Sequence, residues 1–201
     1  DFRVGDRVCI ADDKSCDTFD LESCTFCAAG LPVLCTNKAK RRYHDNVGAG
    51  WSEYFVRHEN QRFGVPDDVS DEVAVLMEPA AVGLHAVLRH PPVPRATLLV
   101  VGAGTIGVAV VAALRAVRID GLDVTVVARH AYQGDEALRL GADRVVSPGE
   151  ALDGFDIVYD CVASAATLGD ALRSLRPRGT LILVGSNGTP AAVDFTPVWQ
   201  R

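Results

Sequence analysis

Hydrophobic and polar positions follow two different patterns along the chain, and the change falls near residue 66. Before it, short apolar runs such as DRVCI (6–10) and WSEYFV (51–56) stand between turns rich in glycine and charge, which predicts short β-strands. From Val73 onward, apolar residues recur at helical spacing until the segment PPVP ends the pattern. One or two helices are therefore expected to lead into a second domain.

The second part of the chain alternates between continuous apolar runs and amphipathic runs. Strands are predicted over ATLLVVGAG, LDVTVVA, RVV, FDIVYDCV and GTLILVG, and helices over TIGVAVVAALRAV, GDEALRLGA and ATLGDALRSLR. Strands that are apolar throughout and alternate with helices are typical of a parallel sheet with helices on both faces. We therefore expect an α/β fold preceded by a smaller β-type region.

Composition and charge change this picture mainly by exclusion. With 201 residues and 48% hydrophobic content, the chain is able to bury an ordinary core without disulfides. No secretory signal pattern opens the sequence, and its apolar runs are shorter than the roughly 18 residues of a membrane span. The net charge of −6 is spread without long runs of one sign. We expect a cytoplasmic protein that binds neither nucleic acid nor membranes.

The cysteines are concentrated in one short segment. CDTFDLESCTFCAAGLPVLC, residues 16–35, contains four of the six cysteines in the chain. In a reducing compartment, clustered cysteines more often bind metal or carry out chemistry than form disulfides. Buried free thiols and a redox pair of Cys24 and Cys27 stand as alternatives to a metal site.

A glycine motif lies between the first apolar strand and its helix. VVGAGTIG places Gly102, Gly104 and Gly107 at the G-x-G-x-x-G spacing. The first glycine permits a tight turn, the second lets a pyrophosphate approach the backbone, and the third lets the helix pack against the strand. The predicted helix then begins with Thr105 and Ile106. The N-terminal end of such a helix presents free N–H groups to phosphates. The motif and its surroundings predict a Rossmann-type doubly wound parallel sheet that binds a dinucleotide.

The end of the next predicted strand bears on cofactor choice. An Asp or Glu about 20 residues after the glycines would hold the ribose hydroxyls of NAD. This chain has Ala128 there, followed by Arg129. An arginine beside the missing acid suits the 2′-phosphate of NADP, so we expect NADP to be preferred over NAD. The alternative is that Arg129 is only a solvated surface residue.

Taken together, these segments resemble the medium-chain zinc-dependent alcohol and polyol dehydrogenases, in particular the sorbitol and threonine dehydrogenases. The motifs that carry the resemblance follow the family order: VGDRV (4–8), the cysteine segment (16–35), GWSEY (50–54), VPDDVSDE (65–72), EPAAVGLHAV (78–87) and VGAGTIG (101–107). The resemblance implies part of a GroES-like catalytic domain over residues 1–66 and a Rossmann domain over 67–190. Residues 191–201 would then begin a truncated return toward the catalytic domain. A homo-oligomer that acts on a small alcohol or polyol is expected.

The resemblance also implies a role for the cysteines. The family carries a structural zinc in a C-x2-C-x2-C-x7-C lobe, whereas this sequence reads C-x7-C-x2-C-x7-C. A longer tether before the second ligand is tolerated because loop closure costs grow slowly with length. The expected structural zinc ligands are therefore Cys16, Cys24, Cys27 and Cys35.

Catalysis in this family transfers a hydride reversibly between an alcohol and NAD(P), with a second zinc at the alcohol. Glu78 matches the glutamate that lies near this catalytic metal in polyol and threonine dehydrogenases; it also suits a helix start. The remaining ligands are expected upstream, so we expect the chain to be an inactive piece of a longer enzyme. A zinc-independent quinone or enone reductase of the same superfamily and a non-catalytic dinucleotide-binding protein are the alternatives.

Overall fold

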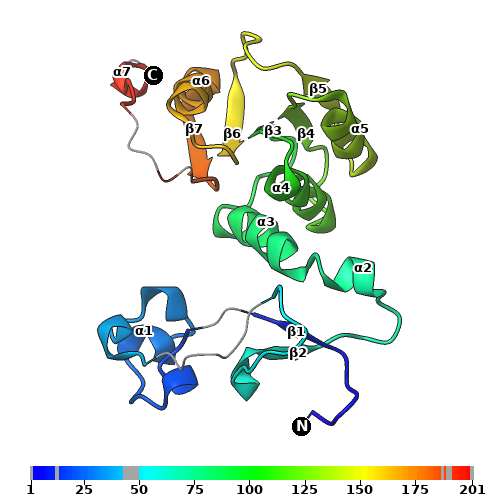
Figure 1. Cartoon of the computed structure of the whole chain (residues 1–201). Coiled ribbons are helices and arrows are strands. Elements are labelled where there is room, and N and C mark those ends of the chain that lie inside the picture. Colours follow the sequence, from blue (N-terminus) through cyan, green and yellow to red (C-terminus); the bar gives the residue numbers. More distant parts are fainter. Residues whose placement is uncertain (1, 12–13, 43–49, 187, 189–191, 200–201) are drawn as a thin grey trace. The chain divides into compact units, whose positions relative to one another are not determined.

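The computed structural model describes residues 2–11, 14–42, 50–186, 188 and 192–199. The chain forms two compact units, Asp1–Met77 and Glu78–Arg201, drawn in Figure 1 from blue to cyan-green and from green to red. Each unit has its own sheet. The finer division predicted at residues 66 and 190 stays a prediction.

The first unit is built around a small antiparallel pair of strands. β1 (Val8–Ile10) pairs with β2 (Arg62–Gly64), with Cys9 opposite Phe63. Around this pair lie helix α1 (Thr25–Ala28), helix α2 (Asp71–Ala74) and the 3₁₀ turns Asp17–Phe19, Pro32–Leu34, Lys38–Lys40 and Glu59–Gln61. The guanidinium of Arg7 binds the carboxylate of Asp71 at 2.6 Å and the carbonyl oxygen of Val69 at 2.8 Å, so it fixes the segment before α2 to β1.

The strand predicted over residues 51–56 is wrong. These residues form turns and irregular backbone, and the large side chains of Trp51 and Tyr54 are exposed. Among the described residues no strand lies beside this run, and a strand without a partner leaves its N–H and C=O groups unpaired. The pairing with β1 is made instead by Arg62–Gly64.

The second unit contains a five-stranded parallel sheet in the order β5-β4-β3-β6-β7. The strands are β3 (Thr97–Val101), β4 (Asp123–Val127), β5 (Arg144–Val146), β6 (Phe155–Asp160) and β7 (Leu175–Leu183). The helices are α3 (Met77–Arg89, which begins in the first unit), α4 (Thr105–Ala116), α5 (Ala131–Arg139), α6 (Ala165–Ser174) and α7 (Thr196–Trp199). The predicted α/β fold with a Rossmann-type parallel sheet is thus confirmed.

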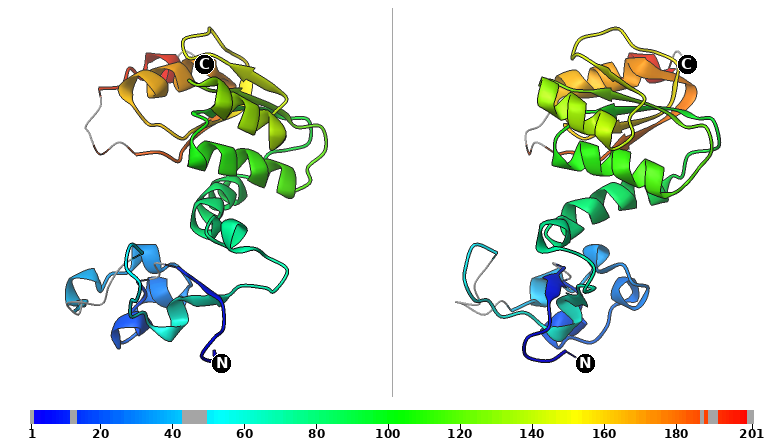
Figure 2. Two further views of the ribbon diagram at one scale, coloured as in Figure 1. Left: turned by 45° about the vertical axis from the view of Figure 1, so that its right-hand side comes forward. Right: turned by 90° about the vertical axis from the view of Figure 1, so that its right-hand side faces the viewer.

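The sheet has a hydrophobic core on each face, because successive side chains of a strand point to opposite faces. In β3, Leu98 and Val100 join the core formed with α3, α4 and α5, whereas Leu99 and Val101 join the core formed with α6. Figures 1 and 2 show α4 and α5 on one side of the sheet and α6 on the other. The continuous apolar runs of the sequence follow directly from this double burial.

Within this unit α3 packs tightly on α4. A β-carbon at Gly83 would lie 2.6 Å from the carbonyl carbon of Ala109, so only glycine lets the two helix backbones approach this closely. Among the described residues, no helix is both long and apolar enough to cross a membrane.

Candidate functional site

The cysteine segment folds into a series of tight turns that bring its four cysteines together. Cys16 precedes the 3₁₀ turn Asp17–Phe19, Cys24 precedes α1, and Cys27 lies within α1. Helix α1 ends at Ala28, and Gly30 just after it has a φ of 72° and donates its N–H to the carbonyl of Cys27 at 3.0 Å. The turn that begins at Pro32 then delivers Cys35 to the same place.

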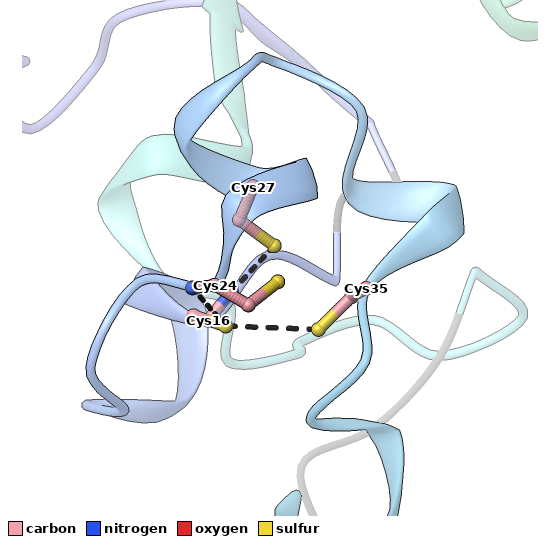
Figure 3. Close-up of side chains that lie close together, drawn as sticks. All are labelled: Cys16, Cys24, Cys27 and Cys35. Atoms are coloured by element: carbon pink, nitrogen blue, oxygen red, sulfur yellow. Dashed lines mark hydrogen bonds between the residues drawn. The ribbon is translucent and has the colours of Figure 1, made fainter.

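The four sulfur atoms form a compact cluster (Figure 3). All Sγ atoms lie within 4.8 Å of one another, and those of Cys16 and Cys35 are 3.6 Å apart. A tetrahedral zinc with Zn–S bonds of about 2.3 Å requires sulfur–sulfur separations of about 3.8 Å. Cys16 and Cys35 are buried, Cys24 and Cys27 are half-buried, and all four are free thiols. The donor set and its spacing therefore fit a closed four-sulfur zinc site.

Backbone N–H groups point at these sulfur atoms. The N–H of Cys24 donates to Sγ of Cys16 at 3.5 Å and lowers the pKa of that thiol. The N–H groups of Cys27 and Thr36 likewise hold the pKa of Cys24 down at about 5, whereas burial raises the pKa of Cys27 to about 12. Part of the cluster thus favours the thiolate form that metal ligation requires.

The glycine loop lies at the carboxyl edge of the second unit's sheet. Val101 pairs with Val127 of β4 on one side and with Asp160 of β6 on the other. The segments that follow these aligned residues therefore meet at one edge. The strand order reverses between β3 and β6, which is where open α/β sheets bind their ligands.

Each glycine of the motif has a distinct steric role. Gly102 has a φ of 93°. A β-carbon at Gly107 would lie 1.8 Å from the carbonyl oxygen of Gly102, so the helix approaches the strand only because this residue is glycine. Gly104 is different, because nothing lies within 4 Å of the point where its β-carbon would be. It precedes α4 and supplies no side-chain cap, so the first N–H groups of the helix, from Thr105 and Ile106, are available to a phosphate.

The loop after β6 completes this edge, and the sequence analysis did not identify it. The buried carboxylate of Asp160 accepts hydrogen bonds from the N–H groups of Val162 and Ala163, both at 2.9 Å, and from the hydroxyl of Thr167 at 3.1 Å. The loop thereby holds Val162 against Gly102. An aspartate that ends an otherwise apolar strand was the available signal.

The other predicted residues occupy different surroundings. Ala128 follows β4, is buried, and donates its N–H to the carbonyl of Val146 at 3.0 Å. Arg129 is exposed and makes no hydrogen bond or ion pair with the residues described. Glu78 is exposed in the first turn of α3. In the part of the chain that the structure describes, the four cysteines are the one group of three or more potential metal ligands, so Glu78 has no second ligand beside it.

Comparison with known proteins finds similarity to the zinc-binding dehydrogenases. The sequence model of the zinc-binding dehydrogenases matches residues 105–201. Sorbitol dehydrogenase from Bacillus subtilis is 29% identical over 96% of the chain, and the match spans 57% of that enzyme. The chain therefore covers little more than half the length of this curated relative.

Solved structures share the fold. Acetophenone reductase from Geotrichum candidum, in complex with NAD, has a TM-score of 0.81 at 21% identity, over 99% of this chain and 57% of that one. A Sinorhizobium meliloti protein described as a zinc-binding dehydrogenase, bound to NADP, has a TM-score of 0.81 at 24% identity, over 100% of this chain and 60% of that one. At this identity the likeness concerns the fold.

Proposed function

We propose that the chain is part of a zinc-dependent medium-chain alcohol or polyol dehydrogenase, and that the protein containing it transfers hydride between an alcohol or polyol and a nicotinamide dinucleotide. One observation carries the proposal. A four-sulfur cage in one unit and a glycine loop at the strand-order reversal of a parallel sheet in the other occur in the same chain. The zinc-independent quinone and enone reductases typically lack such a cage.

The cysteine cage is proposed as a structural zinc site. Cys16, Cys24, Cys27 and Cys35 would supply all four ligands, which leaves no open position for a substrate. Zinc there would cross-link the turns between residues 16 and 35, which otherwise contribute few residues to a hydrophobic core. The cage thus serves folding rather than chemistry.

The glycine loop is proposed as the pyrophosphate site. Gly104 would let the phosphates approach the backbone, and the first N–H groups of α4 at Thr105, Ile106 and Gly107 would donate to them. The bound nicotinamide supplies the hydride chemistry. Gly102 and the loop held by Asp160 would fix the shape of the crevice.

NADP is proposed as the preferred dinucleotide. Ala128 offers no carboxylate to the ribose hydroxyls, and a carboxylate at this position would also repel a 2′-phosphate. The guanidinium of Arg129 is exposed and not engaged by the described residues, so it is available for a charge-assisted contact with that phosphate.

Glu78 remains a candidate for the surroundings of a catalytic zinc, on the strength of its match to the family's glutamate. Since no further ligand accompanies it among the described residues, we assign no reaction step to it. The division at residues 66 and 190, a homo-oligomeric state, and a cytoplasmic location likewise stay proposals.

The test uses the purified protein that contains this chain, assayed for nicotinamide reduction against a panel of alcohols and polyols that includes sorbitol. We expect turnover with at least one of them and bound zinc by elemental analysis. Cys27→Ser should lose zinc, whereas Cys9→Ser should keep it, because Cys9 lies outside the cage and bonds to the carbonyl of Ala74. Metal-free parent protein with freely titratable thiols, or no turnover of any alcohol, would contradict the proposal.

A further inference from the structure

The unusual feature of the cage is the long tether between its first two ligands. Seven residues separate Cys16 from Cys24, where the family pattern has two. A longer tether leaves more conformations to be lost when the first ligand joins the cage. Side chains that hold this tether in place would offset that cost.

Asn37 contacts both the tether and the sulfur atoms. Its side-chain Nδ2 donates to Sγ of Cys16 at 3.3 Å and to the carbonyl oxygen of Glu22 at 3.2 Å. Its backbone N–H donates to Sγ of Cys35 at 3.3 Å. A single residue thus links the first ligand, the last ligand and the end of the tether.

The beginning of the tether is held separately. Nδ2 of Asn60 donates to the carboxylate of Asp17 at 2.9 Å, and the hydroxyl of Thr18 donates to Oδ1 of Asn60 at 3.1 Å. The carbonyl of Cys16 accepts the N–H of Leu21 at 3.0 Å, which closes the tether into a turn. These bonds shape the tether, but of the two asparagine side chains only that of Asn37 reaches a sulfur atom.

The side chain of Asn37 is not used for local capping. Asn37 precedes the 3₁₀ turn Lys38–Lys40, a position at which asparagine commonly accepts a hydrogen bond from the turn's own N–H groups. Here no such bond is made, and the amide is turned toward Cys16 instead. The side chain therefore serves the cage rather than the turn that follows it.

We propose that Asn37 is a positioning residue for the zinc cage and fixes Cys16 as a ligand despite the long tether. The inference rests on the proposed structural zinc. Both hydrogens of the amide are used, one on the sulfur and one on the carbonyl of Glu22. An N–H donor also offsets the charge that four thiolates place around zinc. Aspartate has the same shape but offers only acceptors, so it would repel both partners.

The experiment compares the zinc affinity of the parent chain with that of Asn37→Asp and Asn37→Ala, by competition with a chromophoric chelator. Outer-shell partners of metal ligands typically contribute about 10–100-fold in affinity. We expect Asn37→Ala to weaken zinc binding about tenfold and Asn37→Asp to weaken it further. Lys38→Ala, an exposed neighbour in the same turn, should bind zinc like the parent.

A second readout separates positioning from general stability. In the cobalt-substituted chain, the sulfur-to-cobalt charge-transfer absorption reports the number of bound thiolates, and we expect it to fall in Asn37→Asp. If this variant does not fold, Asn37→Ala decides, because it introduces no charge. Parent-like zinc affinity in the Asn37 variants would overturn the inference and leave the zinc site standing. A parent that binds no zinc would overturn both.

Discussion

The side chain of Val162 lies directly over Gly102, with its Cγ2 atom 2.5 Å from the point where a β-carbon at Gly102 would be. The loop after β6 therefore leaves no room for a side chain at Gly102, the first residue of the glycine loop. Asp160 holds this loop through two backbone N–H groups, so a buried carboxylate on one strand shapes the crevice at the end of its neighbour.

Substitutions at Gly104 and Gly107 should affect dinucleotide binding and folding stability separately. Gly104→Ala introduces a methyl group into open space, so the free energy of unfolding should stay within about 1 kcal/mol of the parent. The same methyl group would occupy the space expected for the pyrophosphate, and dinucleotide binding should weaken at least about tenfold, equivalent to about 1.4 kcal/mol. Gly107→Ala should instead lower stability by about 3 kcal/mol, because its methyl group meets the carbonyl of Gly102. Urea unfolding and fluorescence titration measure the two effects. Unchanged dinucleotide affinity in Gly104→Ala would show that the loop does not bind the phosphates.

Asp156 should make the stability of the second unit depend on pH in the acidic range. Burial raises the pKa of its carboxyl, but the N–H and hydroxyl of Thr97, at 2.7 and 2.9 Å, and the guanidinium of Arg176 outweigh this and lower the pKa overall. A carboxyl whose pKa is lower in the folded state stabilises the fold when the pH is above the ordinary pKa of about 3.9. This stabilisation is lost as the pH falls through the folded-state pKa.

Asp156→Asn should therefore lower the free energy of unfolding by about 1–2 kcal/mol at neutral pH. The difference from the parent should shrink as the pH falls below about 4. Urea unfolding at a series of pH values tests this. Asp153→Asn serves as the control, because the structure shows no such contacts for Asp153 among the described residues. A difference that persists unchanged in acid would mean that the charge of Asp156 is not responsible.

Tyr159 should tolerate loss of its hydroxyl. The side chain is fully buried in β6, burial raises its pKa to about 12, and its Oη has no hydrogen-bond partner among the described residues. A buried hydroxyl without a partner is destabilising, so Tyr159→Phe should raise the free energy of unfolding by about 1 kcal/mol. Chemical denaturation measures this. A loss of stability would reveal a partner for the hydroxyl, such as a buried water.

Cofactor choice should depend on Arg129 and Ala128. A charge-assisted contact between Arg129 and a 2′-phosphate would contribute about 1.5–3 kcal/mol, which corresponds to about a tenfold to hundredfold preference for NADPH over NADH. Arg129→Ala should erase the preference, and Ala128→Asp should reverse it. Parallel fluorescence titrations of parent and variants with both dinucleotides decide the matter. NADH binding that equals or exceeds NADPH binding by the parent would refute the assignment.

The sheet of the second unit was predictable because double burial makes its strands continuously apolar. The segment RVV became β5 (Arg144–Val146), and the glycine motif was placed correctly between β3 and α4. Helix α5 was predicted to start at Gly134, whereas it starts at Ala131. Gly134 lies inside the helix, and a β-carbon there would meet Val145 Cγ1 at 2.9 Å, so the close packing requires glycine at this position. This packing requirement cannot be read from local preference.

In the first unit the cysteine cluster was predictable, but its surroundings were not. The pairing of β1 with β2 joins segments far apart in the sequence, and such pairings leave little local signal. The contact of Asn37 with Cys16 likewise depends on how the turns bring residues 16 and 37 together. Spacing alone gave the ligands but not the side chain that holds the first of them.

Native mass spectrometry of the chain, recorded with and without NADPH, tests the central claim most directly, because one measurement detects both the bound zinc ion and the bound dinucleotide. The account predicts a chain that carries a single zinc ion throughout and gains a single dinucleotide when NADPH is present. A spectrum that shows only the bare polypeptide under both conditions would contradict it.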